Sequence, residues 1–247
     1  MARNKMSYQQ SRSQVFAASG TGGKWSLTGN LMGSTMLYLV GYLFLTALSG
    51  IIVIFTGVLN LASSDVMPLM LVPLFASMFL IYRMRKARSL RGELFMGALV
   101  MVLMGPWVAI MVALVGASSG FAVVWSAVSA VAISVVATSL IVYVSPWDLS
   151  KLSGLAFVAL IALIASEFIN LVLAWTMGVH FLQLWYFIGA AVFELYLVVD
   201  ISRVRRQAVY GPNDGLAAWL ALDLALDIIN LFFYMLMLFS GRGKSFK

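Results

Sequence analysis

Cysteine is missing from this 247-residue sequence, and histidine occurs once, at His180. Without thiols there can be no disulfide, no zinc–thiolate site and no cysteine nucleophile, and one imidazole cannot build a multi-histidine metal site. Charge is scarce as well, because Lys, Arg, Asp and Glu make up 10% of the residues, against about 25% in soluble domains. We also expect no signal peptide, since the N-terminal region has no short apolar run ahead of a small-residue cleavage site.

Apolar residues are abundant instead, at 62% of the chain. Soluble proteins average about 45–50%, so the composition predicts an integral membrane protein. The net charge of +7 does not favour nucleic-acid binding, because basic residues in a membrane protein usually report its topology. The expected surroundings are therefore a lipid bilayer, and no nucleic acid is expected as a partner.

Seven apolar segments approach the length of about 20 residues that a membrane-spanning helix needs. The segments are residues 36–59, 66–82, 94–115, 121–144, 152–175, 181–199 and 216–239. No soluble domain and no internal repeat is evident. We predict an all-α fold of seven transmembrane helices over residues 31–241, between a polar, basic N-terminal tail (1–30) and a basic C-terminal tail (242–247).

Basic residues are distributed unevenly between these segments. The N-terminal tail holds four, the loop "RMRKARSLR" five and the run "RVRR" three, and Lys151 follows the fourth segment. The intervening loops hold none. The positive-inside rule therefore predicts a cytoplasmic N-terminus. Seven crossings then put the basic C-terminal tail on the other side, against the rule, so either this short tail is tolerated there or the last segment does not cross completely; we favour seven crossings.

Five acidic residues fall within the last three segments, although no basic residue lies deep in any of them. They are Glu167, Glu194, Asp200, Asp223 and Asp227. An ionised carboxylate at mid-membrane costs at least about 2.5 kcal/mol, so these side chains must face protein or water, or be protonated. Asp223 and Asp227 share one helix face, and Asp200 could meet Asp227 if the last two helices pack side by side.

Simpler structural roles compete with functional ones at these positions. Glu194 and Glu167, the latter with Asn170 one turn away, could extend a polar track, or they could be protonated groups that hydrogen-bond to another helix. Asp200 lies near the expected interface and could pair with Arg203 or Arg83. A mid-span aspartate such as Asp227 is harder to explain structurally because its burial is expensive.

The last two segments carry the text "FELYLVVDISRVRR" followed by "ALDLALDIINLFFYMLMLFSG". This text resembles the C-terminal signature of the Bax inhibitor-1 family, also called the transmembrane Bax inhibitor motif family, in a bacterial-type member. Asp200 and Asp227 stand at the two family aspartates, Arg83 in "YRMRKA" at the family's latch arginine, and Asn170 at a family asparagine of the fifth helix. Ala225 replaces a tyrosine that is usual in the family.

The resemblance implies six helices wrapped around a central C-terminal seventh, and a pH-sensitive calcium leak gated by the aspartate pair. Asp200, Asp227 and Arg83 would sense pH and gate the pathway, while Asp223, Glu194, Glu167 and Asn170 would line or tune it. Two adjacent carboxyl groups cannot both ionise cheaply, so the pair would share a proton. Carboxylate oxygens also suit Ca²⁺, and Asp200 and Asp227 are therefore the candidate ligands of the transported ion.

Other functions remain open at this point. The chain could be a non-transporting regulator that acts through other membrane proteins, or a proton-coupled cation exchanger. An intramembrane aspartyl protease is disfavoured because the glycine of a "GxGD" motif is absent, so no enzymatic activity is expected. We expect no cofactor, Ca²⁺ and protons as partners, a monomer or weak oligomer, and a location in the bacterial cytoplasmic membrane.

Overall fold

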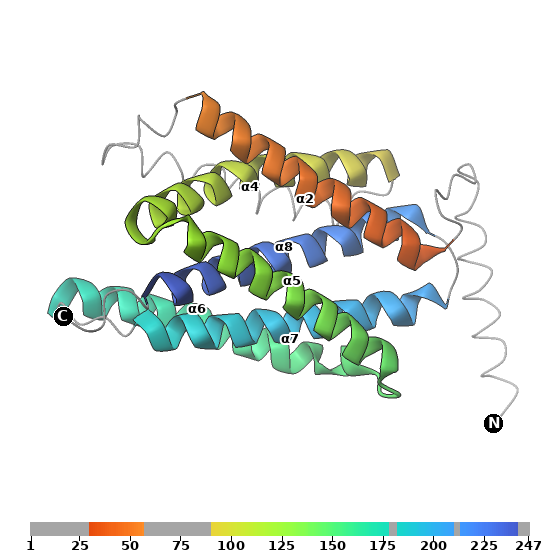
Figure 1. The fold of residues 1–247 in the computed structure, drawn as a ribbon. Helices are drawn as coiled ribbons and strands as arrows, with labels where there is room; N and C mark the ends of the chain where they lie inside the picture. The colour runs from red at the N-terminus through yellow and green to blue at the C-terminus, as the bar shows by residue number, and fades with distance from the viewer. Residues whose placement is uncertain (1–29, 57–89, 178–181, 210–212, 242–247) are drawn as a thin grey trace, which may run out of the picture.

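The computed structural model describes residues 30–56, 90–177, 182–209 and 213–241, and these residues contain helices and no strand. In chain order the elements are α2 (Leu31–Phe55), α4 (Leu90–Ser119), α5 (Phe121–Val144), the short 3₁₀ helix η3 (Leu149–Leu152), α6 (Ser153–Met177), α7 (Leu182–Ala208) and α8 (Asp214–Ser240). Figure 1 shows the six long helices packed as an elongated bundle. The predicted segment 66–82 and Arg83 lie outside the described residues.

Each of the six long helices contains a stretch apolar and long enough to cross a membrane. The membrane prediction therefore holds for the six described segments. Helix α5 has the predicted bounds, whereas α7 continues nine residues past the predicted end at residue 199. The extension carries the basic run "RVRR", and arginine is a good helix former, so the helix does not end where its hydrophobicity does.

The C-terminal helix α8 is the central element of the described bundle. It packs against α2, α4, α5 and α7, and Figure 1 shows it running between the α2–α4 pair and α7. No residue from Asp214 to Ser240 is exposed. Helix α6 packs mainly on α7 and η3, so it forms an outer layer and is not part of the shell directly around α8.

Small residues bring α2 and α4 into close contact. A Cβ atom added to Gly105 would lie 2.5 Å from the carbonyl oxygen of Thr46 and 2.8 Å from the backbone nitrogen of Gly50. Gly50 faces α4 in the same way, with the carbonyl oxygen of Gly105 2.9 Å from an added Cβ. Membrane helices associate largely through such close backbone packing. This contact holds α2 and α4 together, and both helices pack on α8.

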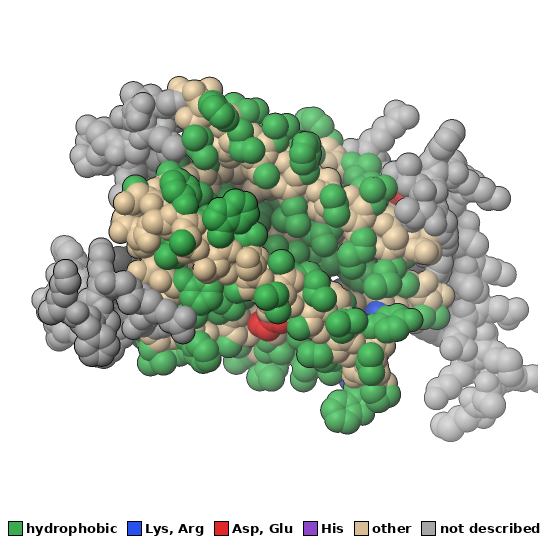
Figure 2. All heavy atoms as spheres, in the orientation of Figure 1, with side chains coloured by type: hydrophobic (Ala, Val, Ile, Leu, Met, Phe, Trp, Pro, Cys, Tyr) green, Lys and Arg blue, Asp and Glu red, His purple; other side chains and the backbone are tan. Residues whose placement is uncertain are grey.

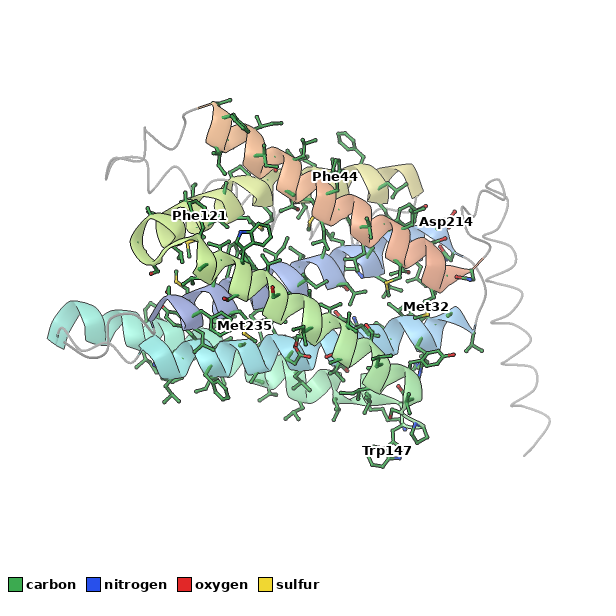
Figure 3. The ribbon with its side chains drawn as sticks, in the orientation of Figure 1. Met32, Phe44, Phe121, Trp147, Asp214 and Met235 are labelled. Atoms are coloured by element: carbon green, nitrogen blue, oxygen red, sulfur yellow. The ribbon has the colours of Figure 1, made fainter. Side chains whose placement is uncertain are left out.

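The outer surface of the bundle is apolar. Figure 2 shows hydrophobic side chains over most of the visible face, and Phe44 of α2 is 65% exposed and points away from the other helices in Figure 3. A soluble protein rarely exposes an apolar surface of this extent. The surface is therefore suited to lipid.

One end of the bundle collects the starts of α2, α4 and α8 and the ends of α5 and α7 (Figure 1). The hydroxyl of Ser34 donates to Asp214 at 3.1 Å, which ties the first turn of α2 to that of α8 (Figure 3). Asn30 and Asn213 cap α2 and α8, because each side chain accepts a hydrogen bond from a backbone N–H of the first turn. We call this end the capped end.

Candidate functional site

The packing of α7 on α8 brings Asp200 and Asp227 together. Both residues are buried, with 5% and 8% of their surface exposed. The two carboxyl groups lie within hydrogen-bonding reach of each other. Asp227 lies 13 residues into α8, about 20 Å from the helix start at a rise of 1.5 Å per residue. The sequence predicted this meeting on the condition that the last two helices pack side by side, which they do.

The contact itself requires a proton. Two ionised carboxylates only accept hydrogen bonds, so one of them must be protonated before a hydrogen bond can join them. Oδ2 of Asp227 is buried and receives no hydrogen bond from any described residue. The Arg203 guanidinium lies 2.9 Å from Oδ1 of Asp200 and favours its ionised form, so Asp227 suits the role of the protonated partner and Asp200 that of the acceptor.

Arg203 supplies the positive charge beside this pair. Its Nη1 lies 2.9 Å from Oδ1 of Asp200, one helical turn earlier, and 3.8 Å from Oδ2 of Asp223 on α8. Arg203 and Asp223 are partly exposed, at 36% and 23%, whereas Asp200 is buried. Exposure therefore decreases across the site, from Arg203 and Asp223, which we call its open end, to the buried Asp227, its closed end.

Tyr196 completes the immediate surroundings. It lies one turn before Asp200 on α7 and within electrostatic range of Asp200, Asp227 and Arg203. A phenol can donate or accept a hydrogen bond, so it can stay satisfied in either protonation state of the pair. Ala225, which replaces a family tyrosine, is fully buried in α8.

Several predicted site residues are not joined to the pair by the described structure. Arg83 lies outside the described residues, and so do the side chains of Glu167 and Asn170 on α6. Glu194 is described, but it contacts α5. Its two carboxylate oxygens accept from the hydroxyls of Ser134 and Thr138.

Arg205 makes a contact that was not predicted from the sequence. Its guanidinium donates to the carbonyl oxygens of Ser145 at 2.8 Å, Trp147 at 3.2 Å and Tyr143 at 3.4 Å, and also to that of Val142. Carbonyl groups at a helix C-terminus lack partners within the helix and carry partial negative charge. Arg205 therefore fastens the end of α7 to the end of α5. The available signal was the run of arginines at the end of α7, which lies at the same end of the bundle as the end of α5 (Figure 1).

Arg206 extends this attachment to the connection before α6. It lies 3.2 Å from Asp148, while the backbone N–H of Ser150 donates to the buried hydroxyl of Ser202 at 3.1 Å. The hydroxyl of Ser150, with help from the Arg206 guanidinium, lowers the pKa of Asp148 below its ordinary value. Both side chains are at least partly exposed, so this pair orders the connection without contributing much stability.

The pair offers carboxylate oxygens, which Ca²⁺ prefers as ligands, but fewer of them than the about 6–8 oxygens of a full calcium site. Among the described residues, no group of three or more His, Cys, Asp or Glu side chains is placed to hold a metal ion. Chemically, the two carboxyl groups can share one proton, and its loss would leave two adjacent negative charges. Asp223 lies at the open end of the site, beside Arg203.

A family model described as "Inhibitor of apoptosis-promoting Bax1" matches residues 28–244. The match spans nearly all of the chain, including both aspartates of the pair and all six long helices. No curated protein is significantly similar to the chain.

Proposed function

This chain belongs to the Bax inhibitor-1 family, and from that premise we propose that it is a pH-sensitive leak pathway for Ca²⁺ gated by the Asp200–Asp227 pair. The observation that carries the proposal is the close approach of two buried carboxyl groups, one on α7 and one on the central helix α8. The family resemblance of the last two helices implies the same activity.

In the closed state the pair holds one proton, and Asp227 donates it to Asp200. Arg203 balances the charge of Asp200 at 2.9 Å. The contact then links α7 to α8 at a buried point. We infer that this link keeps the pathway shut, because α8 is enclosed by α2, α4, α5 and α7.

Loss of the shared proton leaves two negative charges side by side. Two unit charges about 4 Å apart repel by about 4 kcal/mol at an effective dielectric constant of about 20. A shift from about 1% to about 99% of one state needs about 5.5 kcal/mol. The repulsion alone is therefore of the size that changes an open population by orders of magnitude, and flux should rise as the pH rises.

Asp223 would attract the cation at the open end of the site, and the separated carboxylates would offer oxygen ligands to Ca²⁺, the transported ion, in passing. By the positive-inside rule the capped end, which carries the three arginines of α7, would face the cytoplasm. The membrane would be a bacterial cytoplasmic membrane.

The test is Ca²⁺ entry into liposomes that contain the purified protein, followed with a trapped indicator across a pH series. The wild type should show flux that increases with pH. The double variant Asp200→Asn plus Asp227→Asn keeps the polar contact without a titratable proton, so its flux should be low and independent of pH. Asp148→Asn, which removes a partly exposed carboxylate remote from the pair, is the matched control and should behave as the wild type. If the double variant retains both the flux and its pH dependence, the proposal is wrong.

A further inference from the structure

A second carboxyl group lies at mid-membrane depth, away from the Asp200–Asp227 pair. Glu194 is ten residues past the start of the span Leu184–Ala208, about 15 Å along the helix. It precedes Asp200 by six residues, which turns it about 240° around α7 from that side chain. Glu194 therefore faces α5, while Asp200 faces α8.

The surroundings of Glu194 are built from two hydroxyl groups. Ser134 donates to Oε2 and Thr138 donates to Oε1. The two donors are four residues apart on α5, so they lie on one face of that helix. Each carboxylate oxygen thus receives one hydrogen bond from a neutral group.

Glu194 is partly exposed on an apolar face of the bundle. Neighbouring positions on α5 such as Ile133 and Val136 are exposed at 69% and 59%, and Figure 2 shows acidic side-chain atoms in the middle of the hydrophobic surface on the side where α5 crosses α7. A side chain at this depth and exposure meets lipid and not bulk water.

Charged partners for Glu194 are lacking within the described residues. Helix α5 contributes the two hydroxyls and, near its end, Tyr143; the described side chains of α6 that pack on α7 carry no charge. The titratable groups of the other elements packed on α7 are Asp214, Asp223, Asp227 and Tyr234 of α8, Lys151 of η3, and Tyr38 and Tyr42 of α2. Among the described groups, Ser134 and Thr138 alone form a hydrogen bond with Glu194, and none forms an ion pair with it.

A single negative charge held by neutral hydroxyls in a membrane must be neutralised by something that binds it. A divalent cation would leave an excess positive charge, and the few oxygen ligands of this site fall short of the about 6–8 that Ca²⁺ takes. A proton leaves the site neutral and needs no further ligand. The hydroxyls of Ser134 and Thr138 can accept as well as donate, so they can serve both the ionised and the protonated acid without movement of the backbone.

We propose that Glu194, with Ser134 and Thr138, forms a proton-binding site that opens to the lipid between α5 and α7, separate from the Asp200–Asp227 pair. Glu194 binds the proton. Ser134 and Thr138 are positioning residues that adjust the stability of the ionised form. The site does not depend on the leak function and would exist even if that proposal failed.

The site predicts a specific chemical modification. A hydrophobic carbodiimide partitions into lipid and reacts with protonated carboxyl groups there. The carboxyl oxygen forms a bond to the central carbon of the carbodiimide, one C=N π bond breaks, and the acid proton moves to the nitrogen. Migration of the acyl group from oxygen to nitrogen gives a stable N-acylurea, with no leaving group and no oxidation.

The experiment treats the full-length protein in liposomes with dicyclohexylcarbodiimide over a pH series and locates the adduct by peptide mass spectrometry. Glu194 should be labelled while the acid is protonated, and labelling should decrease as the pH rises. Glu194→Gln should lose the adduct, while Asp227→Asn should keep it. The double variant Ser134→Ala plus Thr138→Ala removes both donors to the ionised form, so its labelling should persist to higher pH.

Three results would overturn the proposal. Absence of an adduct at Glu194 at every pH would make Ser134, Thr138 and Glu194 a closed structural contact. Labelling that does not change with pH would mean that the acid does not exchange its proton. Suppression of labelling by sodium chloride but not by choline chloride would assign the site to an alkali cation in place of a proton.

Discussion

Arg203 on α7 reaches across to Asp223 on α8, with 3.8 Å between Nη1 and Oδ2, while the same nitrogen lies 2.9 Å from Asp200 of its own helix. One guanidinium is therefore shared between the buried pair and the more exposed aspartate. Under the proposed function, this sharing makes Arg203, and not only the two aspartates, a determinant of when the pair gives up its proton.

Arg203→Gln should move the pH dependence of Ca²⁺ flux. Removal of the cation disfavours additional negative charge at Asp200 and Asp227, so the pair should hold its proton to higher pH. A neighbouring charge typically changes such a titration by about 1–3 pH units, and the midpoint of the flux curve should rise by about one unit or more. The liposome assay measures this midpoint.

Arg206→Gln is the matched control for that measurement. It removes an arginine three residues later, whose partner is Asp148, and its midpoint should stay at the wild-type value. Equal midpoints for Arg203→Gln and the wild type would contradict a role for Arg203 in the titration of the pair.

Gly105→Ala should destabilise the bundle by forcing α2 away from α4. The added Cβ would meet the backbone at Thr46 and Gly50, and such overpacking costs about 1–3 kcal/mol. Gly41→Ala provides a control in α2, because nothing lies within 4 Å of its added Cβ and alanine favours a helix by about 1 kcal/mol over glycine. Thermal unfolding in detergent should show a lower midpoint for the first variant alone, and equal losses in both would argue against the close contact.

Arg205→Ala should destabilise the junction between α5 and α7. Hydrogen bonds to a charged group contribute about 1.5–3 kcal/mol in net terms, and Arg205 makes several to the end of α5. Arg205→Lys should recover only part of the loss, because an ammonium group cannot reproduce the planar fork of donors. Full recovery with lysine in the same unfolding experiment would mean that charge alone matters there.

Ser150→Ala should raise the pKa of Asp148 toward its ordinary value, and by more than Arg206→Gln does. The hydrogen bond from the Ser150 hydroxyl is the largest of the causes that lower the pKa of Asp148, and Arg206 comes next among them. Since the pKa is lowered in the folded protein, any stabilisation from Asp148 is present above its unfolded pKa and is lost as the pH falls through the folded one, so its contribution should not change with pH near neutrality. A carboxyl ¹³C titration by NMR measures the pKa, and the reverse order of the two variants would contradict this assignment.

Hydrophobicity was sufficient to locate the described helices, but not their ends. Apolar runs predicted α5 to the residue, whereas α7 runs on to Ala208 through arginines that are polar and yet helix-forming. The positions of Asp200 and Asp227 were readable because their depth and their motif agree. The pairing of Asp200 with Arg203 was one of two alternatives in the sequence, whereas the reach of Arg203 to Asp223 was not readable, because it depends on the rotation of α7 against α8.

The partners of Glu194 could not be read from the sequence for a different reason. Serine and threonine in an apolar helix often donate to the carbonyl group four residues earlier in their own helix, as Ser126 does to Ala122 in α5. Ser134 and Thr138 look the same in the sequence. The packing of α5 against α7 decides whether such a hydroxyl donates to a carbonyl group of its own helix or to a side chain of another helix.

Arg203, Arg205 and Arg206 occupy a single turn of α7, yet each is held by a different part of the chain: α8, the end of α5, and the connection before α6. Turning α7 about its own axis would break all three attachments at once. These three attachments therefore oppose rotation of α7 about its own axis. Under the proposed gating, we expect Asp200 and Asp227 to part by a slide or tilt of α8 against α7, because that movement breaks the Arg203–Asp223 attachment and leaves those of Arg205 and Arg206 in place.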